Sequence, residues 1–392
     1  MIITRLHLQN WRNFKSANAV LRDVTYVLGI NASGKSNFLD VFCFLRDVAK
    51  STGGGLQKAV SDRGTLKKLR CLHARTNPEV GLEIEISNSA DDPFPTWKYR
   101  LTFNIEAKGA HRLLVVEEIV TKYDGNGNEQ ILIKRPDKQD QADSERLTQT
   151  ALEQIQANAQ FRELAEFFGS TTYLHVVPQL LKFGDLIGGR KLEDDPFGQG
   201  FMERIARTGE VTRKRRLARI EKVLKEVIPQ VEQLDFVRDE ISGTPHLEVR
   251  YIHHRPRGAI QREDQFSDGT LRLISLFWLL LDGTSLLLLE EPELSLNEEI
   301  VAQLPRLIEK VQKSTKKKRQ IIVTTHSKSL LGNAGIDGRS LLILQPSNEG
   351  TAISRATDAE LEAMESGFSP AEVVLPRAQK VSGSNLQMDI FG

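Results

Sequence analysis

Residues 29–36 have the types and the spacing that bind the phosphates of a nucleotide. They read Gly-Ile-Asn-Ala-Ser-Gly-Lys-Ser, follow a predicted strand at 24–28 and precede a predicted apolar helix at 37–48. In this strand–loop–helix setting the backbone N–H groups of the loop surround phosphate oxygens, Lys35 reaches the β- and γ-phosphates, and the Ser36 hydroxyl binds Mg²⁺. The predicted phosphate-binding residues are Gly29, Asn31, Ser33, Gly34, Lys35, Ser36 and Asn37.

A second segment, residues 266–297, combines a helix start with a pair of carboxylates. It begins Phe-Ser-Asp-Gly-Thr, so Ser267 and a flexible glycine stand where unpaired N–H groups and the helix dipole favour a phosphate. The helix that follows is apolar on nearly every side and should be buried. The aliphatic run at 286–289 predicts a central parallel strand, with Glu290 and Glu291 at its carboxyl end. That position suits ligand chemistry, although acidic residues there could simply mark the exit of a strand into solvent.

Together these segments resemble the ABC ATPases of the RecF/SMC type, which are α/β P-loop NTPases of the ABC-ATPase head type with a central, mostly parallel sheet. The resemblance implies that ATP and Mg²⁺ bind at the loop, with Ser36 and Glu290 near the ion. It assigns Glu291 as the catalytic glutamate and His326, in Val-Thr-Thr-His-Ser, as the switch histidine, with the D-loop at 295–297. It also implies a head-to-tail homodimer, in which the nucleotide of one copy meets the signature residues Ser267, Gly269 and Thr270 of the other.

Two positions depart from the family pattern. Glu290 stands where an aspartate usually associates with Mg²⁺, so its carboxylate is one methylene longer and the ion can have a different water arrangement. Asp268 stands where glycine is common and adds negative charge near a triphosphate. We therefore expect Ser267 and Gly269, rather than Asp268, to meet the nucleotide.

Two residues outside these segments are assigned through the same resemblance. Gln179 follows a predicted strand at 171–177 and corresponds to the Q-loop glutamine, which senses Mg²⁺ and the γ-phosphate. Arg12 lies in Asn-Trp-Arg-Asn-Phe, which resembles the opening motif of the family, where the arginine tends to lie near the nucleotide. An exposed arginine in a turn is the alternative for Arg12.

The composition predicts a soluble, cytoplasmic protein. The 392 residues suffice for one large or two ordinary domains, and 53 Lys and Arg nearly balance 52 Asp and Glu, so any nucleic-acid contact must be local. Cys43 and Cys71 supply neither a disulfide framework nor a metal cluster. The N-terminus lacks the core of a signal peptide, and no apolar run reaches the roughly 18 residues of a membrane span.

Alternating and helical patterns predict the elements around the motifs. A helix is predicted at 145–168, further helices run from about 201 to 228, and 314–319 is expected to be a charged turn before a buried strand at 320–324. A hairpin turn is predicted at 124–127. Period-two alternation predicts antiparallel strands at 2–8, 80–86, 97–105, 113–123 and 131–134.

The order of these elements divides the chain into lobes. No sustained heptad is present, which excludes the long coiled coil of SMC proteins. The predicted parts are an N-terminal ATPase lobe with an antiparallel β insertion at 1–180, a helical insertion lobe at 181–258, a C-terminal ATPase lobe at 259–377, and a flexible tail at 378–392.

The densest basic run, residues 213–219, lies in the insertion lobe and reads Arg-Lys-Arg-Arg-Leu-Ala-Arg. Closely spaced cations could contact DNA or RNA phosphates, or they could form one solvated face of a helix that continues with mixed charge. Aromatic residues are not interleaved with the cations, which disfavours stacking on single strands.

The role of the ATPase is a separate question from its chemistry. No nuclease constellation lies beyond the predicted head. Short RecF-like ATPases without an effector resemble the ATPase subunits of two-gene bacterial anti-phage or abortive-infection systems, in which a separate partner does the damage. The first hypothesis is therefore a regulatory ATPase that controls an effector protein and senses through residues 184–232. A RecF-like DNA-repair ATPase and, less favoured, the nucleotide-binding subunit of a transporter are the alternatives.

Overall fold

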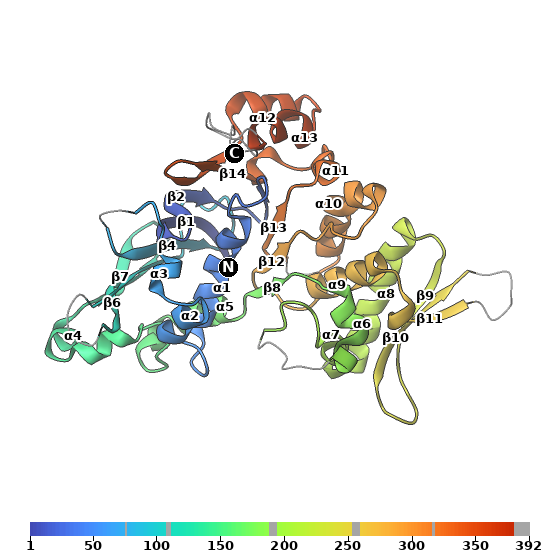
Figure 1. Ribbon diagram of the computed structural model, residues 1–392, viewed down its shortest axis with the longest axis horizontal. Coiled ribbons are helices and arrows are strands. Elements are labelled where there is room, and N and C mark those ends of the chain that lie inside the picture. The colour runs from blue at the N-terminus through green and yellow to red at the C-terminus, as the bar shows by residue number, and fades with distance from the viewer. Residues whose placement is uncertain (75–76, 107–110, 188–193, 253–258, 316–317, 380–392) are drawn as a thin grey trace, which may run out of the picture.

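A six-stranded, mostly parallel sheet lies at the centre of the computed structural model (Figure 1). The structure describes residues 1–392 except 75–76, 107–110, 188–193, 253–258, 316–317 and 380–392. The strands of this sheet are β3 (Val24–Leu28), β8 (Thr172–Leu174), β12 (Leu287–Glu290), β13 (Ile321–Thr325), β14 (Leu341–Ser347) and β15 (Gly350–Arg355). Their spatial order is β15-β14-β3-β13-β12-β8, and β15 alone among these pairs antiparallel with its neighbour.

The parallel strands are covered on both faces, as their aliphatic runs predict. Side chains alternate along a strand, so Leu288 joins one hydrophobic core, whereas Leu287 and Leu289 join the other. The first core contains α1 (Lys35–Ala49), and the second contains α9 (Asp268–Leu281) and α10 (Glu298–Lys313). Consequently α1 and α9, which carry the two predicted phosphate-binding helix starts, lie on opposite faces of the sheet. The predicted α/β fold class is confirmed.

The N-terminal strands form a second six-stranded sheet, which is antiparallel throughout. The predicted alternation is confirmed, because Trp97, Tyr99 and Leu101 are fully buried and the residues between them are not. The hairpin turn after Tyr123 is also confirmed, and the Asp124 carboxylate accepts backbone N–H groups within it. The strands are β1 (Ile2–Trp11), β2 (Phe14–Val20), β4 (Val80–Ser87), β5 (Trp97–Ile105), β6 (Leu113–Tyr123) and β7 (Glu129–Arg135).

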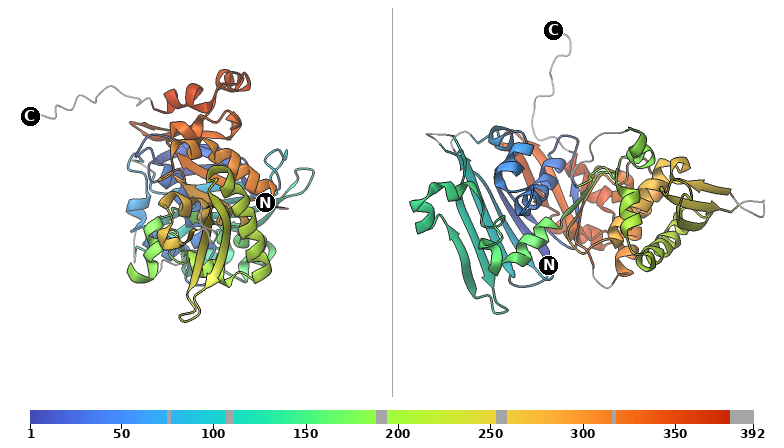
Figure 2. Two further views of the ribbon diagram at one scale, coloured as in Figure 1. Left: turned by 90° about the vertical axis from the view of Figure 1, so that its right-hand side faces the viewer. Right: turned by 90° about the horizontal axis from the view of Figure 1, so that it is seen from below.

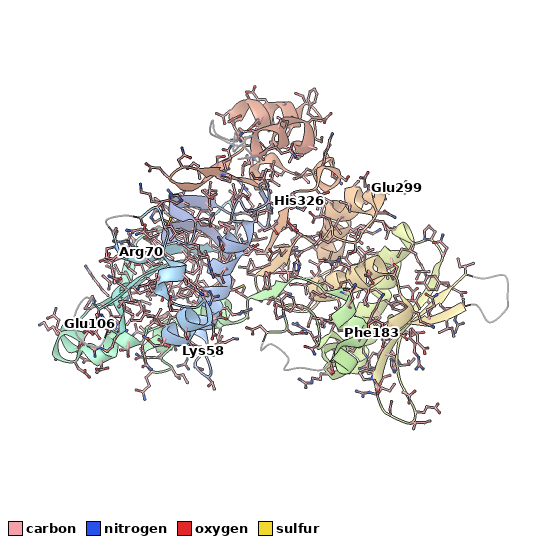
Figure 3. All side chains as sticks on the ribbon, viewed as in Figure 1. Lys58, Arg70, Glu106, Phe183, Glu299 and His326 are labelled. Carbon is pink, nitrogen blue, oxygen red and sulfur yellow. The ribbon has the colours of Figure 1, made fainter. Side chains whose placement is uncertain are left out.

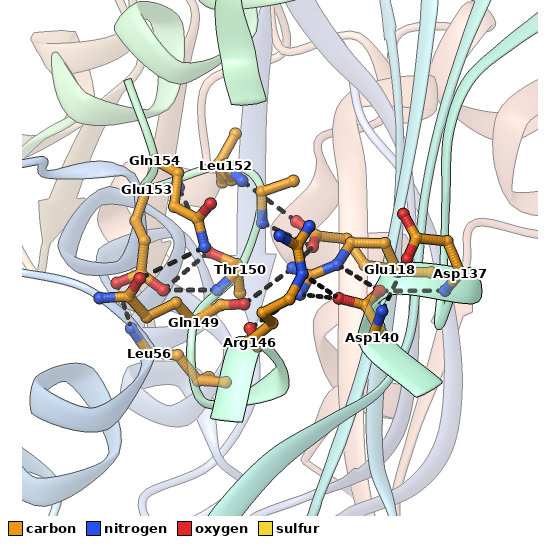
Figure 4. A network of polar contacts seen from close by, with 12 residues as sticks. Leu56, Glu118, Asp137, Asp140, Arg146, Gln149, Thr150, Leu152, Glu153 and Gln154 are labelled. Carbon is orange, nitrogen blue, oxygen red and sulfur yellow. Dashed lines mark hydrogen bonds and ion pairs between the residues drawn. The ribbon is translucent and has the colours of Figure 1, made fainter. Parts of the chain in front are cut away.

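The prediction of a single helix at 145–168 is wrong. The fully buried carboxylate of Glu118 accepts hydrogen bonds from the backbone N–H groups of Ala151 and Leu152, at 2.7 and 3.2 Å (Figure 4). Buried Arg135 donates to two main-chain carbonyls of the same segment, each at 2.8 Å. These bonds occupy backbone groups that a continuous helix would pair internally, so tertiary contacts override the helical pattern. The region instead contains α4 (Lys138–Ala142), 3-10 turns at Ser144–Thr148 and Ala157–Gln160, and α5 (Arg162–Gly169).

Residues 178–262, which include the predicted insertion lobe, contain the predicted helices and a sheet that the sequence analysis did not predict. Figure 2 shows this three-stranded sheet at the opposite end of the molecule from the antiparallel sheet of the first lobe. The longest helix in the described part of the lobe has 18 residues, in agreement with the absence of a long coiled coil. The elements are α6 (Pro178–Ile187), α7 (Phe201–Arg207), α8 (Glu210–Val227), β9 (Val231–Arg238), β10 (Pro245–Tyr251) and β11 (Ala259–Arg262).

The prediction of a charged, solvent-facing turn at 314–319 is wrong for Arg319. Its side chain is only 2% exposed, and its guanidinium donates to the carbonyls of Leu279, Asp282 and Ser285 at 2.7, 2.8 and 2.6 Å. Burial lowers the pKa of Arg319 to about 10. This side chain therefore ties the end of α9 to the loop that leads into β12.

Short helices complete the described part of the chain. One of them is α12 (Asp358–Glu365). The predicted flexible tail at 378–392 lies, from residue 380 onward, outside the described residues. The remaining helices are α2 (Leu56–Asp62), α3 (Leu66–Leu69), α11 (Lys328–Leu331), α13 (Pro370–Val373) and α14 (Leu375–Ala378).

Candidate active site

The predicted phosphate loop ends in a helix start with unpaired backbone N–H groups. Gly34 precedes α1 with a φ of +98°, the helix has no side-chain cap, and no acidic residue lies in its first turn. A Cβ at Gly34 would lie 2.0 Å from Asn13 Nδ2, so the position needs glycine for both its conformation and its space. An uncapped helix start of this kind favours a phosphate group.

The other loop residues differ in how they face the site. Asn31 is exposed, whereas Gly29 and Ser33 are buried. A Cβ at Gly29 would lie 2.3 Å from Ser33 Oγ, so this glycine lets the loop fold back on itself. Ser33 Oγ is buried without a hydrogen-bond partner, which leaves a polar atom in the loop for a ligand.

The N-terminal motif at 10–14 supports the phosphate loop through hydrogen bonds. Asn13 Nδ2 donates to Ser33 O at 3.2 Å, and Thr351 Oγ1 donates to the same carbonyl at 3.0 Å. Asn37 Nδ2 donates to Asn13 Oδ1 at 2.8 Å, and Trp11 Nε1 donates to Asn37 O at 3.0 Å. The side chain of Asn37 therefore supports the loop. The sequence analysis gave Asn13 no role, because its contact with residue 33 depends on the fold.

Three of the predicted catalytic and phosphate-binding side chains meet at the end of the central strands. Lys35 Nζ donates to Gly29 O at 3.0 Å and lies 3.7 Å from Glu291 Oε1. His326 Nδ1 lies 3.0 Å from the same carboxylate oxygen, so Nδ1–H donates to it. Glu291 has a φ of +44°, in the left-handed region, and its N–H donates to Thr324 O at 3.1 Å. Figure 3 places His326 at the end of β13, near the centre of the molecule.

Ser36 and Glu290, the predicted Mg²⁺ neighbours, are in direct contact. Ser36 Oγ donates to Glu290 Oε1 at 2.5 Å. The other oxygen, Glu290 Oε2, accepts from the hydroxyl of Tyr173. Tyr173 lies in β8, and the sequence analysis missed it because 117 residues separate it from Glu290.

Arg12 contacts an acidic residue on α1. Its Nη2 donates to Asp40 Oδ2 at 2.7 Å, and Arg63 Nε donates to Asp40 Oδ1 at 2.8 Å. Arg12 lines a polar cleft of about 1250 Å³, which adjoins the predicted Mg²⁺ neighbours. Lys58, labelled in Figure 3, also lines this cleft, together with Ser36, Asp40, Arg63, Tyr173 and Glu290.

The signature residues form a capped helix start beside the D-loop. Ser267 Oγ accepts from Thr270 N at 3.1 Å and lies 2.8 Å from Thr270 Oγ1. Ser267 is exposed, and a Cβ at Gly269 would lie 3.0 Å from Ser295 O. The glycine therefore permits close packing of the signature against the D-loop, where Ser295 has a φ of +62°.

Gln179, which lies in α6, contacts the start of the signature helix α9 in this structure. Its Nε2 donates to Asp268 Oδ2 at 3.0 Å, and Lys182 Nζ pairs with Asp268 Oδ1 at 2.7 Å. Asp268 therefore anchors α6 to the start of α9. The predicted contact of Gln179 with Mg²⁺ requires that this hydrogen bond be exchanged for another.

The signature does not complete the phosphate site of its own chain. Across the described residues, no hydrogen bond or ion pair joins 267–270 to the loop at 29–36. The two segments belong to helices on opposite faces of the parallel sheet.

The donor set fits ATP with Mg²⁺. The helix start, the unpaired Ser33 Oγ and Lys35 suit phosphate oxygens. Mg²⁺ is commonly bound through one or two carboxylates, substrate phosphates and waters, and Ser36 with Glu290 supplies such a set. Groups of three or more His, Cys, Asp or Glu that could hold a metal ion are not found within the described ranges.

Part of the basic run at 213–219 is engaged within the chain. The Arg213 guanidinium lies 4.1 Å from the centroid of the Phe236 ring. Arg216 pairs with Asp282 at 2.9 Å. Arg213 therefore packs on β9, and Arg216 joins α8 to the end of α9. A nucleic-acid contact through the run remains a prediction.

The fold and the site define a P-loop ATPase of the SMC-head type. The phosphate loop, the paired carboxylates at the end of β12 and the histidine at the end of β13 are the features of the site that indicate this class. The chain belongs to the AAA_21 family, described as "AAA domain, putative AbiEii toxin, Type IV TA system", which matches residues 24–332.

One of the similar solved structures supports the same fold. A structure of an SMC head bound to the C-terminal winged-helix domain of ScpA shares 15% identity, with a TM-score of 0.53, and the match covers 92% of this chain and 99% of that one. The SMC head domain from Thermotoga maritima shares 17% identity, with a TM-score of 0.45, over 91% of this chain and 100% of that one. No curated protein shows significant similarity in sequence. None of the helices in the described ranges has both the length and the apolar character that a membrane crossing requires.

Proposed function

We propose that this ATPase closes as a head-to-tail homodimer around two MgATP molecules and thereby controls a separate effector protein in bacterial anti-phage defence. The observation that carries the dimer is the position of the signature. It has an exposed serine, lies on the opposite face of the sheet from the phosphate loop, and makes no polar contact with it in the described residues. A second copy would supply what each phosphate loop lacks.

The residues at the phosphate loop would act together in hydrolysis. Lys35 would leave the Gly29 carbonyl for phosphate oxygens, and Ser36 and Glu290 would hold Mg²⁺, directly or through water. The ion, when bound, offsets negative charge on the β- and γ-phosphates. Glu291 would orient and deprotonate the attacking water as a general base. A protonated His326 would keep its bond to Glu291 and donate its second N–H to the γ-phosphate.

Signature closure would depend on the contact between the lobes. Gln179 and Lys182 hold Asp268 before nucleotide contact, and movement of Gln179 toward Mg²⁺ would release one of these bonds. Ser267 and Gly269 would then meet the nucleotide of the partner. The differential contact in the closed state is what allows ATP to shift the equilibrium toward it.

The defence role is supported by the family description, which names a toxin and a toxin–antitoxin system. We place the ATPase lobes at 1–180 and 259–377 and the sensing surface in the lobe at 181–258, within 184–232, of which residues 188–193 lie outside the described structure. On this proposal the protein is cytoplasmic. The alternative of a RecF-like ATPase acting on DNA through residues 213–219 is kept for the following test.

Steady-state ATP hydrolysis separates these roles. The purified protein is assayed with and without duplex DNA at two salt concentrations, with Glu291→Gln as the blank. We expect a slow rate that DNA does not change, because a protein partner controls the enzyme. Stimulation by DNA that fades as salt rises would contradict this and favour the repair alternative, since phosphate contacts weaken with salt.

A growth assay tests the regulatory role separately. Expression of the chain alone is expected to leave host growth unchanged, because the effector is a separate protein. Growth arrest by the wild type that the Lys35→Ala variant abolishes would instead make this chain the toxic component.

A further inference from the structure

Tyr173 contacts the carboxylate that replaces the usual aspartate, and no sequence motif assigns it a role. β8 pairs with β12 in parallel, with Tyr173 opposite Leu288, two residues before Glu290. The hydroxyl donates to Glu290 Oε2, while Ser36 Oγ donates to Glu290 Oε1 at 2.5 Å. Both oxygens of this carboxylate therefore have a fixed partner.

The extra methylene of a glutamate makes such a constraint useful. Relative to aspartate, the carboxylate extends by one C–C bond, about 1.5 Å. It also gains one further side-chain torsion, with three staggered positions, so its oxygens can occupy more positions than those of aspartate. Hydrogen bonds to both oxygens of Glu290, one from Tyr173 and one from Ser36, restrict that torsion and set the direction of the carboxylate.

The tyrosine is suited to act as a permanent donor. Its ring packs against the first hydrophobic core. Burial, and then the hydrogen bond to Glu290, raises the pKa of Tyr173 well above its usual value.

We propose that Tyr173 is a positioning residue that aims the Glu290 carboxylate at the Mg²⁺ of the bound nucleotide, so that tyrosine and glutamate at these positions act as a pair. The inference rests on the proposed MgATP site. It explains how a longer carboxylate can take the place of aspartate next to Ser36. It also predicts that the shorter residue is not interchangeable here, since aspartate would lose the contact with Tyr173.

A double-mutant cycle tests the pair through binding rather than turnover. Binding of a fluorescent ATP analogue is titrated with Mg²⁺ for the wild type, Tyr173→Phe, Glu290→Asp and the double variant. Tyr173→Phe should raise the Mg²⁺ concentration at half-saturation about tenfold, the effect of one hydrogen bond to a charged group. Binding in EDTA should stay unchanged, because the phenol does not contact the nucleotide. In the Glu290→Asp background the same substitution should have no further effect.

Tyr26→Phe is the matched control, because it also removes a tyrosine hydroxyl from this sheet but on the opposite face, in the second core. Its Mg²⁺ titration should match that of the wild type. An Mg²⁺ titration of Tyr173→Phe that matches the wild type would overturn the pairing. Additive effects of Tyr173→Phe and Glu290→Asp would overturn it as well. If Tyr173→Phe does not fold, the test rests on Glu290→Asp alone. An Mg²⁺ concentration at half-saturation of Glu290→Asp that is equal to or below that of the wild type would contradict the proposal. Absence of Mg²⁺-dependent binding by the wild type would instead refute the site itself.

Discussion

The phosphate-loop region and the signature region of this protein differ in how complete they are within one chain. Around the phosphate loop, Lys35 Nζ and His326 Nδ1 lie 3.7 and 3.0 Å from Glu291 Oε1, and Ser36 contacts Glu290. In the signature region the hydroxyls of Ser267 and Thr270 bond to each other, and Asp268 contacts Gln179 and Lys182 of α6. On the proposed function, the first region binds the nucleotide and the second closes onto the partner copy. A single chain would then bind the nucleotide without enclosing it.

Glu291→Gln should produce the largest effect and separates binding from chemistry. Loss of the general base is expected to slow hydrolysis about 10³-fold. Binding should change little, because glutamine retains a carbonyl oxygen for the His326 bond. Phosphate release and nucleotide titration measure the two effects. The control is Glu309→Gln, which removes an exposed carboxylate that pairs only with Lys313 in the described contacts. Near-normal hydrolysis by Glu291→Gln would exclude Glu291 as the general base.

Lys35→Ala should weaken ATP binding about 10²-fold, the scale of hydrogen bonds from a charged group to phosphate. Isothermal titration calorimetry gives the affinity directly. Lys214→Ala is a suitable control, since that lysine is exposed and forms an i,i+4 pair with Glu210. An unchanged affinity in Lys35→Ala would show that the loop is not the nucleotide site.

Ser267→Arg would test whether the two regions are separate. A bulky cation at the exposed helix start should block closure and lower hydrolysis about tenfold or more, whereas binding to the monomer stays within about twofold. Loss of the N-cap should also lower stability by about 1 kcal/mol, which thermal denaturation measures. If affinity fell together with the rate at protein concentrations where the chain is monomeric, the signature would belong to the site of its own chain.

Asp268→Asn should have the smallest effect. Gln179 and Lys182 donate to different oxygens of Asp268, and the amide keeps only one acceptor oxygen for them. Because the lost charge is partly exposed, stability should change by less than about 1 kcal/mol. Easier release of Gln179 should raise the hydrolysis rate a few-fold in the same phosphate-release assay. A lower rate would mean that the contact between α6 and α9 assists the active state rather than delays it.

The features that the sequence predicts well are those fixed by local spacing. The phosphate loop, the buried helix after Ser267 and the carboxylates after β12 depend on residues within one strand, loop or helix, and the fold confirms those elements. The alternating strands of the first lobe were predictable for the same reason. Each of these patterns also agrees with the burial of its apolar positions.

The features that the sequence analysis missed depend on contacts between distant segments. The helix expected at 145–168 is interrupted by Glu118, a buried carboxylate from another strand. Arg319 belongs to a charged run, yet carbonyls from three positions between 279 and 285 receive its N–H groups. Tyr173 and Asn13 gain their roles only when β8 reaches β12 and the first hairpin reaches the phosphate loop.

The most direct test of the account is the mass of Glu291→Gln in solution. Multi-angle light scattering is run with MgATP and without nucleotide, after nucleotide binding has been confirmed. The account predicts a species of twice the 44.1 kDa chain mass with MgATP and the single-chain mass without it, with Ser267→Arg in the same background remaining at the single-chain mass. A 44.1 kDa species in saturating MgATP would contradict the proposal that two copies close around the nucleotide.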